Sequence, residues 1–448
     1  MARRSKQKTF QSPKGMSDIL PGVHKYWEKF FKVSKEFATY YGFETIEPPV
    51  LEFAEVFNKG VGASTDIIEH EMYTLKTKGG DFLALRPELT AGVVRAYIEN
   101  SFFNQPQPVK FFHHGPVFRH ESPQAGRYRS FHQADFDVIG ESDAVVDAQL
   151  IQLIYSVLSE IGLKNLTIRI NSIGDKNCWN KYRDEVKMYY RSKVNRLCKN
   201  CKKRFKENPL RLLDCKEGDC VVLKATAPNS IDYLDKACHD HFKLVLEFLD
   251  ELSLPYILDP YLVRGLDYYT RTVFEIAPED VSGSQITLAS GGRYDYLVEE
   301  LGGKQTPATG GSIGIERVVN EMRRQELKVA TLKPKIRVFL AQLGDMAKKK
   351  SLKLFGEFRK NNIPVCESFG RDSIKAQLRV ADHSGADLAL IIGQKEAIDN
   401  TVIIKEMQSG IQEIIPLEKI IDEVKKRLKK ITPRVPQLTN NSVDNDNE

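Results

Sequence analysis

The sequence lacks any long apolar run. Its longest one, around residues 388–392, falls far short of the roughly 18 residues that a membrane-spanning helix needs. Residues 1–11 are basic and lack the apolar stretch of a secretory signal. We therefore expect that no helix crosses a bilayer, and that the protein is cytoplasmic with reduced cysteines.

A strong imbalance of charge is also missing. The chain carries 66 lysines and arginines against 60 aspartates and glutamates, which gives a net charge of +6. This excess permits a polyanionic partner but does not require one. The shares of hydrophobic residues (41%) and charged residues (28%) are those of a globular protein. Because 448 residues exceed one ordinary core, two or three domains are expected.

Periodicity predicts the first elements. Apolar residues recur at helical spacing over residues 26–41 and Gly42 follows, which predicts an amphipathic helix. Segments 109–119 and 129–139 flank a polar loop and predict an antiparallel hairpin. Alternate residues of the second strand face opposite sides of the sheet. The packed face comprises His132, Ala134, Phe136 and Val138. The polar face comprises Phe131, Gln133, Asp135 and Asp137.

The later part of the chain changes character several times. From Asp175 to about residue 245 it is basic, cysteine-bearing and helical in pattern, which indicates an insertion. A helix is predicted from Ile315 to Met322, and the first domain is expected to end near residue 326. Apolar strands at 338–340, 363–366 and 388–392 alternate with helical patterns, which predicts a parallel α/β module. Residues 432–448 have hardly any large apolar side chain, so a disordered tail is expected.

Arginines stand where predicted strands meet loops rich in glycine or proline. They are Arg86, Arg119, Arg127, Arg264 and Arg317. The planar guanidinium group binds phosphate or carboxylate through two parallel hydrogen bonds, which a lysine does less well. Any one of them alone is equally consistent with a surface salt bridge. If several converge, they would grip a triphosphate.

Short motifs around these arginines carry a family resemblance. The segments LRPELT (85–90), FRHE (118–121), RGLDYY (264–269) and GIER (314–317), with Pro48 and Pro49, resemble the motifs of class II aminoacyl-tRNA synthetases. The runs VRGLDYYTRTVFE (263–275) and SGGRY (290–294) resemble stretches peculiar to the histidyl-tRNA synthetase family. The similarity extends from Pro13 to about Lys430.

The resemblance implies an architecture and an activity. The fold would be α+β, with an antiparallel-sheet catalytic domain over residues 1–326, a helical insertion at about 175–245, and a C-terminal α/β anticodon-binding domain over 335–430. The activity would be that of a histidine–tRNA ligase. It would activate histidine with ATP and Mg²⁺ to histidyl-adenylate and pyrophosphate, and then transfer histidine to the 3′ end of tRNA(His). The family also implies a homodimer.

ATP binding is implied for five residues. They are Arg119, Glu121, Arg127, Phe131 and Arg317. Arg119 would hold the α-phosphate, while Arg127 and Arg317 would hold the β,γ end. Phe131 would stack on adenine, and Glu121 would accept a hydrogen bond from its amino group. Arg119 and Arg264 are the catalytic candidates, because charge develops on the α-phosphate oxygens during the attack by histidine.

Histidine binding is implied for a second set. It comprises Glu88, Thr90, Gln133, Asp137, Arg264, Tyr268 and Tyr269. The first three would accept hydrogen bonds from the ammonium group, and Arg264 would reach the carboxylate. Asp137 with Tyr268 or Tyr269 would hold the imidazole. Relatives often have glutamate at Asp137 and glycine at Leu89; the shorter aspartate leaves room for a bridging water.

The polar loop 121–128 resembles the one that meets the acceptor end of the tRNA. Gln124 and Arg129 are the candidate contacts there, since an unpaired end is read by side chains that reach base edges and phosphates.

The cysteines suggest a metal site in the insertion. The pairs Cys198-x2-Cys201 and Cys215-x4-Cys220 match the spacing of four-thiolate zinc sites. Four reduced thiols in a helical insertion are the equally weighted alternative. The remaining three, Cys178, Cys238 and Cys366, are expected to be ordinary thiols.

Other functions fit only parts of the sequence. A non-catalytic histidine sensor of synthetase ancestry usually lacks the anticodon module and part of the 264–269 stretch. A class II synthetase for proline or threonine would not need Asp137 and the paired tyrosines. A purely RNA-binding role would leave the arginine set unexplained.

Overall fold

The computed structural model describes residues 10–62, 65, 67–122, 126–215, 217–279, 287–330, 337–371 and 373–431. The chain divides into two compact units, Met1–Ala330 and Thr331–Glu448. The predicted disordered tail, residues 432–448, lies outside the described residues.

The first unit is built on an eight-stranded sheet with the spatial order β1-β5-β6-β11-β10-β9-β7-β8. The strands are β1 (Glu44–Thr45), β5 (Val109–Phe118), β6 (Ser130–Ile139), β7 (Leu166–Ser172), β8 (Tyr256–Leu258), β9 (Thr270–Pro278), β10 (Ala289–Arg293) and β11 (Ala308–Gly314). Only the edge pairs β1 with β5 and β7 with β8 run parallel among these. The predicted hairpin is confirmed, because β5 and β6 pair antiparallel along their whole length.

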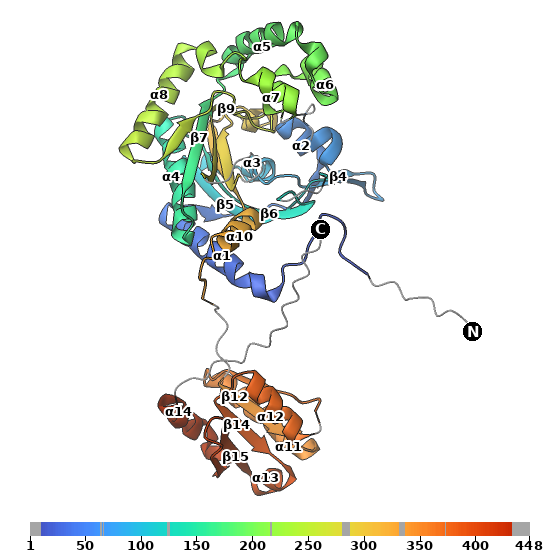
Figure 1. Ribbon diagram of the computed structural model, residues 1–448, viewed down its shortest axis with the longest axis vertical. Coiled ribbons are helices and arrows are strands. Elements are labelled where there is room, and N and C mark those ends of the chain that lie inside the picture. Colours follow the sequence, from blue (N-terminus) through green and yellow to red (C-terminus); the bar gives the residue numbers. More distant parts are fainter. Residues whose placement is uncertain are drawn as a thin grey trace, which may run out of the picture. The chain divides into compact units, whose positions relative to one another are not determined.

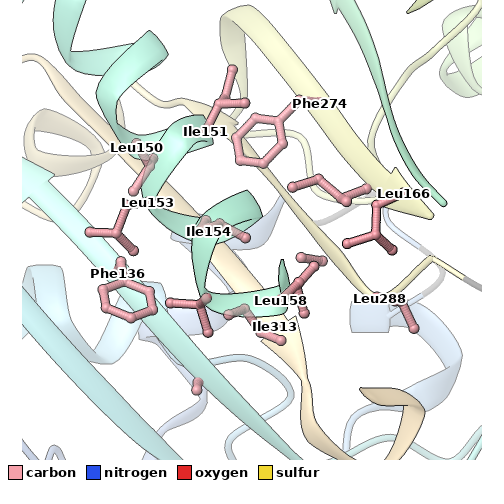
Figure 2. Packing of buried hydrophobic residues seen from close by; sticks show 14 of the residues in the cluster. Phe136, Leu150, Ile151, Leu153, Ile154, Leu158, Leu166, Phe274, Leu288 and Ile313 are labelled. Carbon is pink, nitrogen blue, oxygen red and sulfur yellow. The ribbon is translucent and has the colours of Figure 1, made fainter. Parts of the chain in front are cut away.

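Helices cover one face of this sheet (Figure 1). They are α1 (Pro21–Tyr40), α4 (Ala144–Ile161), α8 (Lys236–Glu251) and α10 (Ile315–Arg324). Figure 2 shows α4 residues such as Ile154 and Leu158 packed against Phe136, Phe274 and Ile313 of the strands. Among the described residues, α4 is the one helix long and apolar enough to cross a membrane, and more than half of it is buried in this core. Burial of its apolar side chains fixes the sheet's packed face.

Two of the predicted helices are present, and one of them begins at a different residue from the one predicted. Helix α10 begins at Ile315, as the sequence indicated. Helix α1 begins at Pro21, five residues earlier than predicted from periodicity. Proline is favoured in the first turn, where its missing N–H is not needed. The first turn of α1 contributes no fully buried residue, so the apolar pattern could not reveal it.

The other face of the sheet carries smaller elements. These are a three-stranded sheet, β2 (Leu51–Phe53), β4 (Phe82–Leu85) and β3 (Thr74–Lys76), and the helices α2 (Ala54–Val61), α3 (Thr90–Glu99) and α9 (Leu297–Glu300). The predicted insertion is helical: α5 (Lys176–Arg191), α6 (Lys199–Glu207) and α7 (Gly218–Lys224) lead into α8. Its own small core contains Tyr182, Leu213 and Cys201.

The second unit holds a five-stranded sheet with the order β13-β12-β14-β15-β16. Its elements are β12 (Val338–Gln342), α11 (Asp345–Lys360), β13 (Val365–Glu367), α12 (Ile374–His383), β14 (Leu388–Ile392), α13 (Gln394–Asp399), β15 (Thr401–Glu406), β16 (Gln412–Pro416) and α14 (Ile420–Lys430). The prediction of a parallel module is correct for β12, β13 and β14 but wrong for the last two strands, which are antiparallel. The short connection between β15 and β16 permits only a hairpin, since a parallel crossover needs a dozen or more residues.

Candidate active site

A cavity of about 510 Å³ lies on the face of the main sheet opposite α4. Its floor is formed by β6, β10 and β11, where Gln133, Asp135, Ser290 and Ser312 contribute side chains. Its rim includes the segment Val263–Tyr269 and residues of the insertion. The polar face predicted for β6 therefore does not point to solvent: its inner half is buried and forms the bottom of the cavity.

Four of the five candidate arginines line this cavity: Arg119, Arg127, Arg264 and Arg317. Arg119 donates to the Pro87 carbonyl (2.8 Å), and its guanidinium carbon lies 5.4 Å from the centre of the Phe131 ring. Arg317 donates to the carbonyls of Gly126 (3.1 Å) and Thr287 (2.9 Å). These carbonyl partners fix the direction of the Arg119 and Arg317 guanidinium groups without neutralising their charge, so both can bind an anion.

The electrostatics of the arginine cluster also favour binding of an anion. Burial, followed by the neighbouring Arg119, lowers the pKa of Arg317. Glu121 lies 3.4 Å from Arg127 and 4.0 Å from Arg119 and provides partial compensation. Arg264 is bound by the Glu275 carboxylate and donates to the Ser290 hydroxyl at 2.6 Å. The arrangement can hold several phosphate oxygens at once.

The fifth arginine has a different role. Arg86 is 5% exposed and does not line the cavity. Its guanidinium donates to the carbonyls of Pro116 (2.8 Å) and Pro48 (2.9 Å) and contacts the His113 ring (3.2 Å). Burial lowers its pKa. Arg86 therefore does not join the converging arginines, because its guanidinium binds the backbone carbonyls of Pro48 and Pro116.

Beside the arginines the cavity becomes acidic. Glu88 is 3% exposed and accepts from the backbone N–H groups of Thr90 and Ala91, both at 2.8 Å. Thr90 and Gln133 also line the cavity, and Gln133 donates to the Ser312 hydroxyl at 2.6 Å. Its amide oxygen has no hydrogen-bond partner in the described part of the chain. This oxygen can accept a hydrogen bond from a cationic ligand.

Aromatic side chains close the acidic end. Tyr268 and Tyr269 both line the cavity with ring centres 4.6 Å apart. The Tyr268 hydroxyl donates to Glu88 at 3.4 Å. Tyr294 stands edge-on to Tyr268 at 5.6 Å. Apolar walls with a few acceptors suit a small, flat, polar ring.

Asp137 lies below the residues that line the cavity, and its predicted contact with the histidine ring stays a prediction. It is fully buried, accepts from Tyr294 (2.5 Å) and Thr90 (3.5 Å), and does not line the cavity, whereas Asp135 does. The candidate set omitted Asp135, which lines the cavity, and Tyr294, which binds Asp137 behind the lining. Tyr294 stood within the quoted SGGRY run, and Asp135 had been assigned to the same strand face, so both signals were present.

The buried carboxylates resist ionisation. Burial raises the pKa of Asp137 to about 7, although the hydrogen bond from Tyr294 opposes the rise. Burial and the Asp137 charge raise the pKa of Asp135 well above its usual value. Burial also raises the pKa of Glu88. A cationic ligand placed beside these groups would favour their ionised forms.

The candidate tRNA contacts are only partly described. Gln124 lies outside the described residues. Arg129 does not line the cavity: its side chain donates to the Glu121 carbonyl at 3.1 Å, and its backbone N–H to Gly15 at 2.7 Å. This side chain therefore holds the base of the loop in the present structure.

The insertion reaches the cavity with its cysteines. The sulfur atoms of Cys198, Cys201, Cys215 and Cys220 all lie within 4.8 Å of one another, and Cys198 and Cys215 line the cavity. Arg211 of the insertion donates to the Gly265 carbonyl at 2.5 Å, next to Arg264. Arg211, which lies between the two cysteine pairs in the chain, thus links the insertion to the loop that carries Arg264.

A second group, Asp175, Cys178, Asp235 and Cys238, also gathers within 4.8 Å. Here both aspartates already cap helices, Asp175 for α5 and Asp235 for α8, by accepting backbone hydrogen bonds. The two thiols are buried beside them, in keeping with the ordinary role expected from the sequence.

Comparisons with known proteins give concordant matches. A family model described as "Histidyl-tRNA synthetase" matches residues 15–318, and one described as "Anticodon binding domain" matches residues 316–427. A "Histidine--tRNA ligase" of Dehalococcoides mccartyi is 42% identical over 94% of this chain and 100% of its own length. The protein of the same description from Halothermothrix orenii is 41% identical over 93% of this chain and 99% of its length. The solved apo histidyl-tRNA synthetase of S. aureus superposes with a TM-score of 0.74 at 31% identity, covering 93% of this chain and all of that one.

Proposed function

The chain belongs to the histidyl-tRNA synthetase family and is a histidine–tRNA ligase, and from that premise we propose which side chains carry its reaction. The enzyme activates histidine with ATP to histidyl-adenylate and pyrophosphate, and then transfers histidine to the 3′ end of its tRNA. The observation that carries the assignment of side chains is that Arg119, Arg127, Arg264 and Arg317 converge on one cavity beside buried carboxylates.

ATP occupies the arginine-lined half and enters as its Mg²⁺ complex. Arg119 holds the α-phosphate, and Arg127 and Arg317 hold the β,γ end. Adenine stacks on Phe131 with its amino group donating to Glu121. The 5.4 Å contact between Arg119 and the Phe131 ring supports this, because base and α-phosphate must lie close together.

Histidine occupies the acidic half. Its ammonium group donates to Glu88, Thr90 and Gln133, and the free amide oxygen of Gln133 supports that placement. Its ring lies among Tyr268, Tyr269 and the buried acids of β6. Asp137 acts through Tyr294, which it holds in place, and not by lining the cavity.

Chemistry takes place where the halves meet. A carboxylate oxygen of histidine attacks the α-phosphorus, the bond to the β-phosphate oxygen breaks, and pyrophosphate leaves. No proton has to move in this step. Arg264 and Arg119 stabilise the negative charge that builds up on the α-phosphate oxygens, and preformed donors of this kind are worth more inside a cavity than in water. Glu275 and Ser290 position Arg264 for that task.

The tRNA binds both units. Its acceptor end meets the loop that contains Gln124 and Arg129, where the terminal hydroxyl group attacks the adenylate carbonyl and AMP leaves. We assign residues 1–326 to the catalytic domain, with the helical insertion at about 175–245. Residues 335–430 form the anticodon-binding domain, supported by the match over 316–427.

A homodimer is favoured by an exposed apolar surface. On one face of the three-stranded sheet beside Pro48 and Pro49, Leu51, Phe53 and Leu75 are 42%, 56% and 38% exposed. Large apolar side chains gathered on one small sheet are typical of an interface.

We place the enzyme in the cytoplasm, where translation takes place.

The four-cysteine cluster is proposed to hold structural zinc. Zn–S bonds of about 2.3 Å in a tetrahedron place sulfurs about 3.8 Å apart. The Cys198 and Cys215 sulfurs are 3.8 Å apart. Backbone N–H groups of Cys201 and Cys198 donate to the sulfurs of Cys198 and Cys220, both at 3.4 Å, which suits thiolates. Bound zinc would brace the insertion where it contacts the Arg264 loop.

Replacement of Arg264 tests the assignment. In Arg264→Ala we expect single-turnover adenylate formation to slow by about 10²–10³-fold, the usual loss when one transition-state donor is removed. Histidine binding measured by calorimetry should change little, and Arg183→Ala on the exposed side of α5 is the matched control. Full adenylation activity in Arg264→Ala would refute its role.

A further inference from the structure

The segment that carries Arg264 contains no helix or strand. It comprises residues 259–269, between β8 and β9, and Gly265 beside the arginine is exposed. Because neither a helix nor a sheet supplies hydrogen bonds to the backbone here, contacts with side chains from elsewhere must hold it. The precision with which Arg264 meets a substrate therefore depends on those contacts.

The insertion supplies one such side chain, that of Arg211. It belongs to a short 3₁₀ helix, Pro209–Asp214, whose leucines form part of the insertion's own core. The Arg211 guanidinium donates to the Gly265 carbonyl at 2.5 Å, and its Nε atom lies 3.7 Å from the Asp267 carboxylate. One buried guanidinium thus contacts the Arg264 segment at two points, one and three residues after Arg264.

Further contacts join the insertion to the same segment. The Asn208 amide donates to the Asp267 carboxylate at 3.4 Å, and the Tyr261 hydroxyl group donates to the Ala227 carbonyl at 3.0 Å. The backbone N–H of Asp267 donates to the carbonyl of Val61 in α2 at 3.0 Å. Asp267 is therefore the point at which the insertion, α2 and the Arg264 segment meet.

Arg211 also lines the cavity, but its contacts are directed at the segment and not at the space where the other arginines converge. The nearby Asp267 carboxylate offsets its charge, which weakens it as a partner for phosphate. A role through Arg264 is favoured over direct contact with a substrate.

We propose that Arg211 is a positioning residue for adenylate formation, which holds the backbone beside Arg264 so that the Arg264 guanidinium meets the α-phosphate. This inference rests on the role of Arg264 proposed above. Glu275 and Ser290 hold the side chain of Arg264, and Arg211 holds its backbone. A donor displaced by about 1 Å can cost about 10²-fold in rate, so the insertion contributes to the first step of the reaction before any tRNA has bound.

Replacement of Arg211 tests the proposal. Arg211→Met keeps the apolar stem of the side chain and removes its donors. We expect single-turnover adenylate formation to slow about 10- to 100-fold, while the calorimetric Kd values for ATP and histidine stay within about twofold of wild type. Arg196→Met, at an exposed arginine of the same insertion, is the matched control. A rate equal to that of the control would overturn the proposal.

A double-mutant cycle separates positioning from a merely structural role. If Arg211 acts through Arg264, Arg211→Met should cost no further rate in the Arg264→Ala background, because the group that it positions is absent. A general structural defect, or direct contact between Arg211 and a substrate, would slow both backgrounds by the same factor and would overturn the proposal. Thermal midpoints show that each protein is folded at the assay temperature. Arg211→Lys, which keeps one donor group, should lie between Arg211→Met and wild type.

Failure of this inference can be told from failure of the role assigned to Arg264. If Arg264→Ala slows adenylate formation and Arg211→Met does not, only the present inference is wrong. If Arg264→Ala keeps the full rate, the catalytic role of Arg264 is wrong, and the positioning role of Arg211 with it.

Discussion

The hydrogen bond between Tyr294 and Asp137 gives a prediction that can be worked from the structure. Both groups are buried, the hydroxyl group donates over 2.5 Å, and Thr90 at 3.5 Å is a weak second donor. Tyr294→Phe removes the main donor and leaves the rest of the packing intact. A hydrogen bond to a charged group contributes about 1.5–3 kcal/mol, against about 1 kcal/mol for a neutral one.

The sign of the pH dependence follows from the raised pKa. Because folding raises the pKa of Asp137 to about 7, its contribution to stability is full below the usual pKa of 3.8 and is lost as pH rises through about 7. Without the Tyr294 hydroxyl group the folded-state pKa rises further. The destabilisation caused by Tyr294→Phe should therefore be about 1 kcal/mol at pH 5.5 and approach 3 kcal/mol at pH 8.5.

Scanning calorimetry at the two pH values measures this difference, with Tyr40→Phe as control because Tyr40 is 84% exposed. An equal loss of stability at pH 5.5 and 8.5 would refute the coupling of the hydroxyl group to an ionising carboxyl. No loss at either pH would refute the hydrogen bond.

Two further predictions concern assembly and metal. In Phe53→Glu the Kd of the dimer should rise at least about tenfold, since the introduced carboxylate would be desolvated at the apolar interface. Light scattering checks this, with Leu352→Glu in the second unit as the control. An intact dimer would contradict the proposed interface. Wild-type protein purified with zinc present should carry about one zinc ion per chain, measured by mass spectrometry. Cys198→Ser should carry much less zinc, whereas the control Cys366→Ser should match the wild type. Equal zinc content in all three proteins would contradict the four-thiolate site.

The local sequence pattern was sufficient to predict those helices and strands whose ends are clearly marked in the sequence. The β5–β6 hairpin, α10 and β14 have the bounds that periodicity indicated, to within one or two residues. Strands β15 and β16 were not predicted. β16 is mostly exposed and does not have the apolar run that revealed β14. Its place is decided by pairing with β15, which sequence pattern does not contain.

The site shows the same limit at the level of side chains. Residue type and the family resemblance indicated that Arg119, Arg264 and Glu88 belong to one site, and all three line the same cavity. They could not separate Asp135 from Asp137, because both lie on the same face of β6. The difference comes from Tyr294 on the segment after β10, which covers Asp137 only once the sheet has formed. Sequence pattern also could not set Arg86 apart from the other arginines, because its carbonyl partners come from Pro48 and Pro116, far apart in the chain.

The central claim is that the arginine cluster holds one nucleotide beside a pocket shaped for histidine. ATP–pyrophosphate exchange, measured with each of the twenty amino acids in turn, tests it most directly. We expect exchange driven by histidine alone and slowed about 10²–10³-fold in Arg264→Ala. Exchange driven best by another amino acid, or undiminished in Arg264→Ala, would contradict the claim.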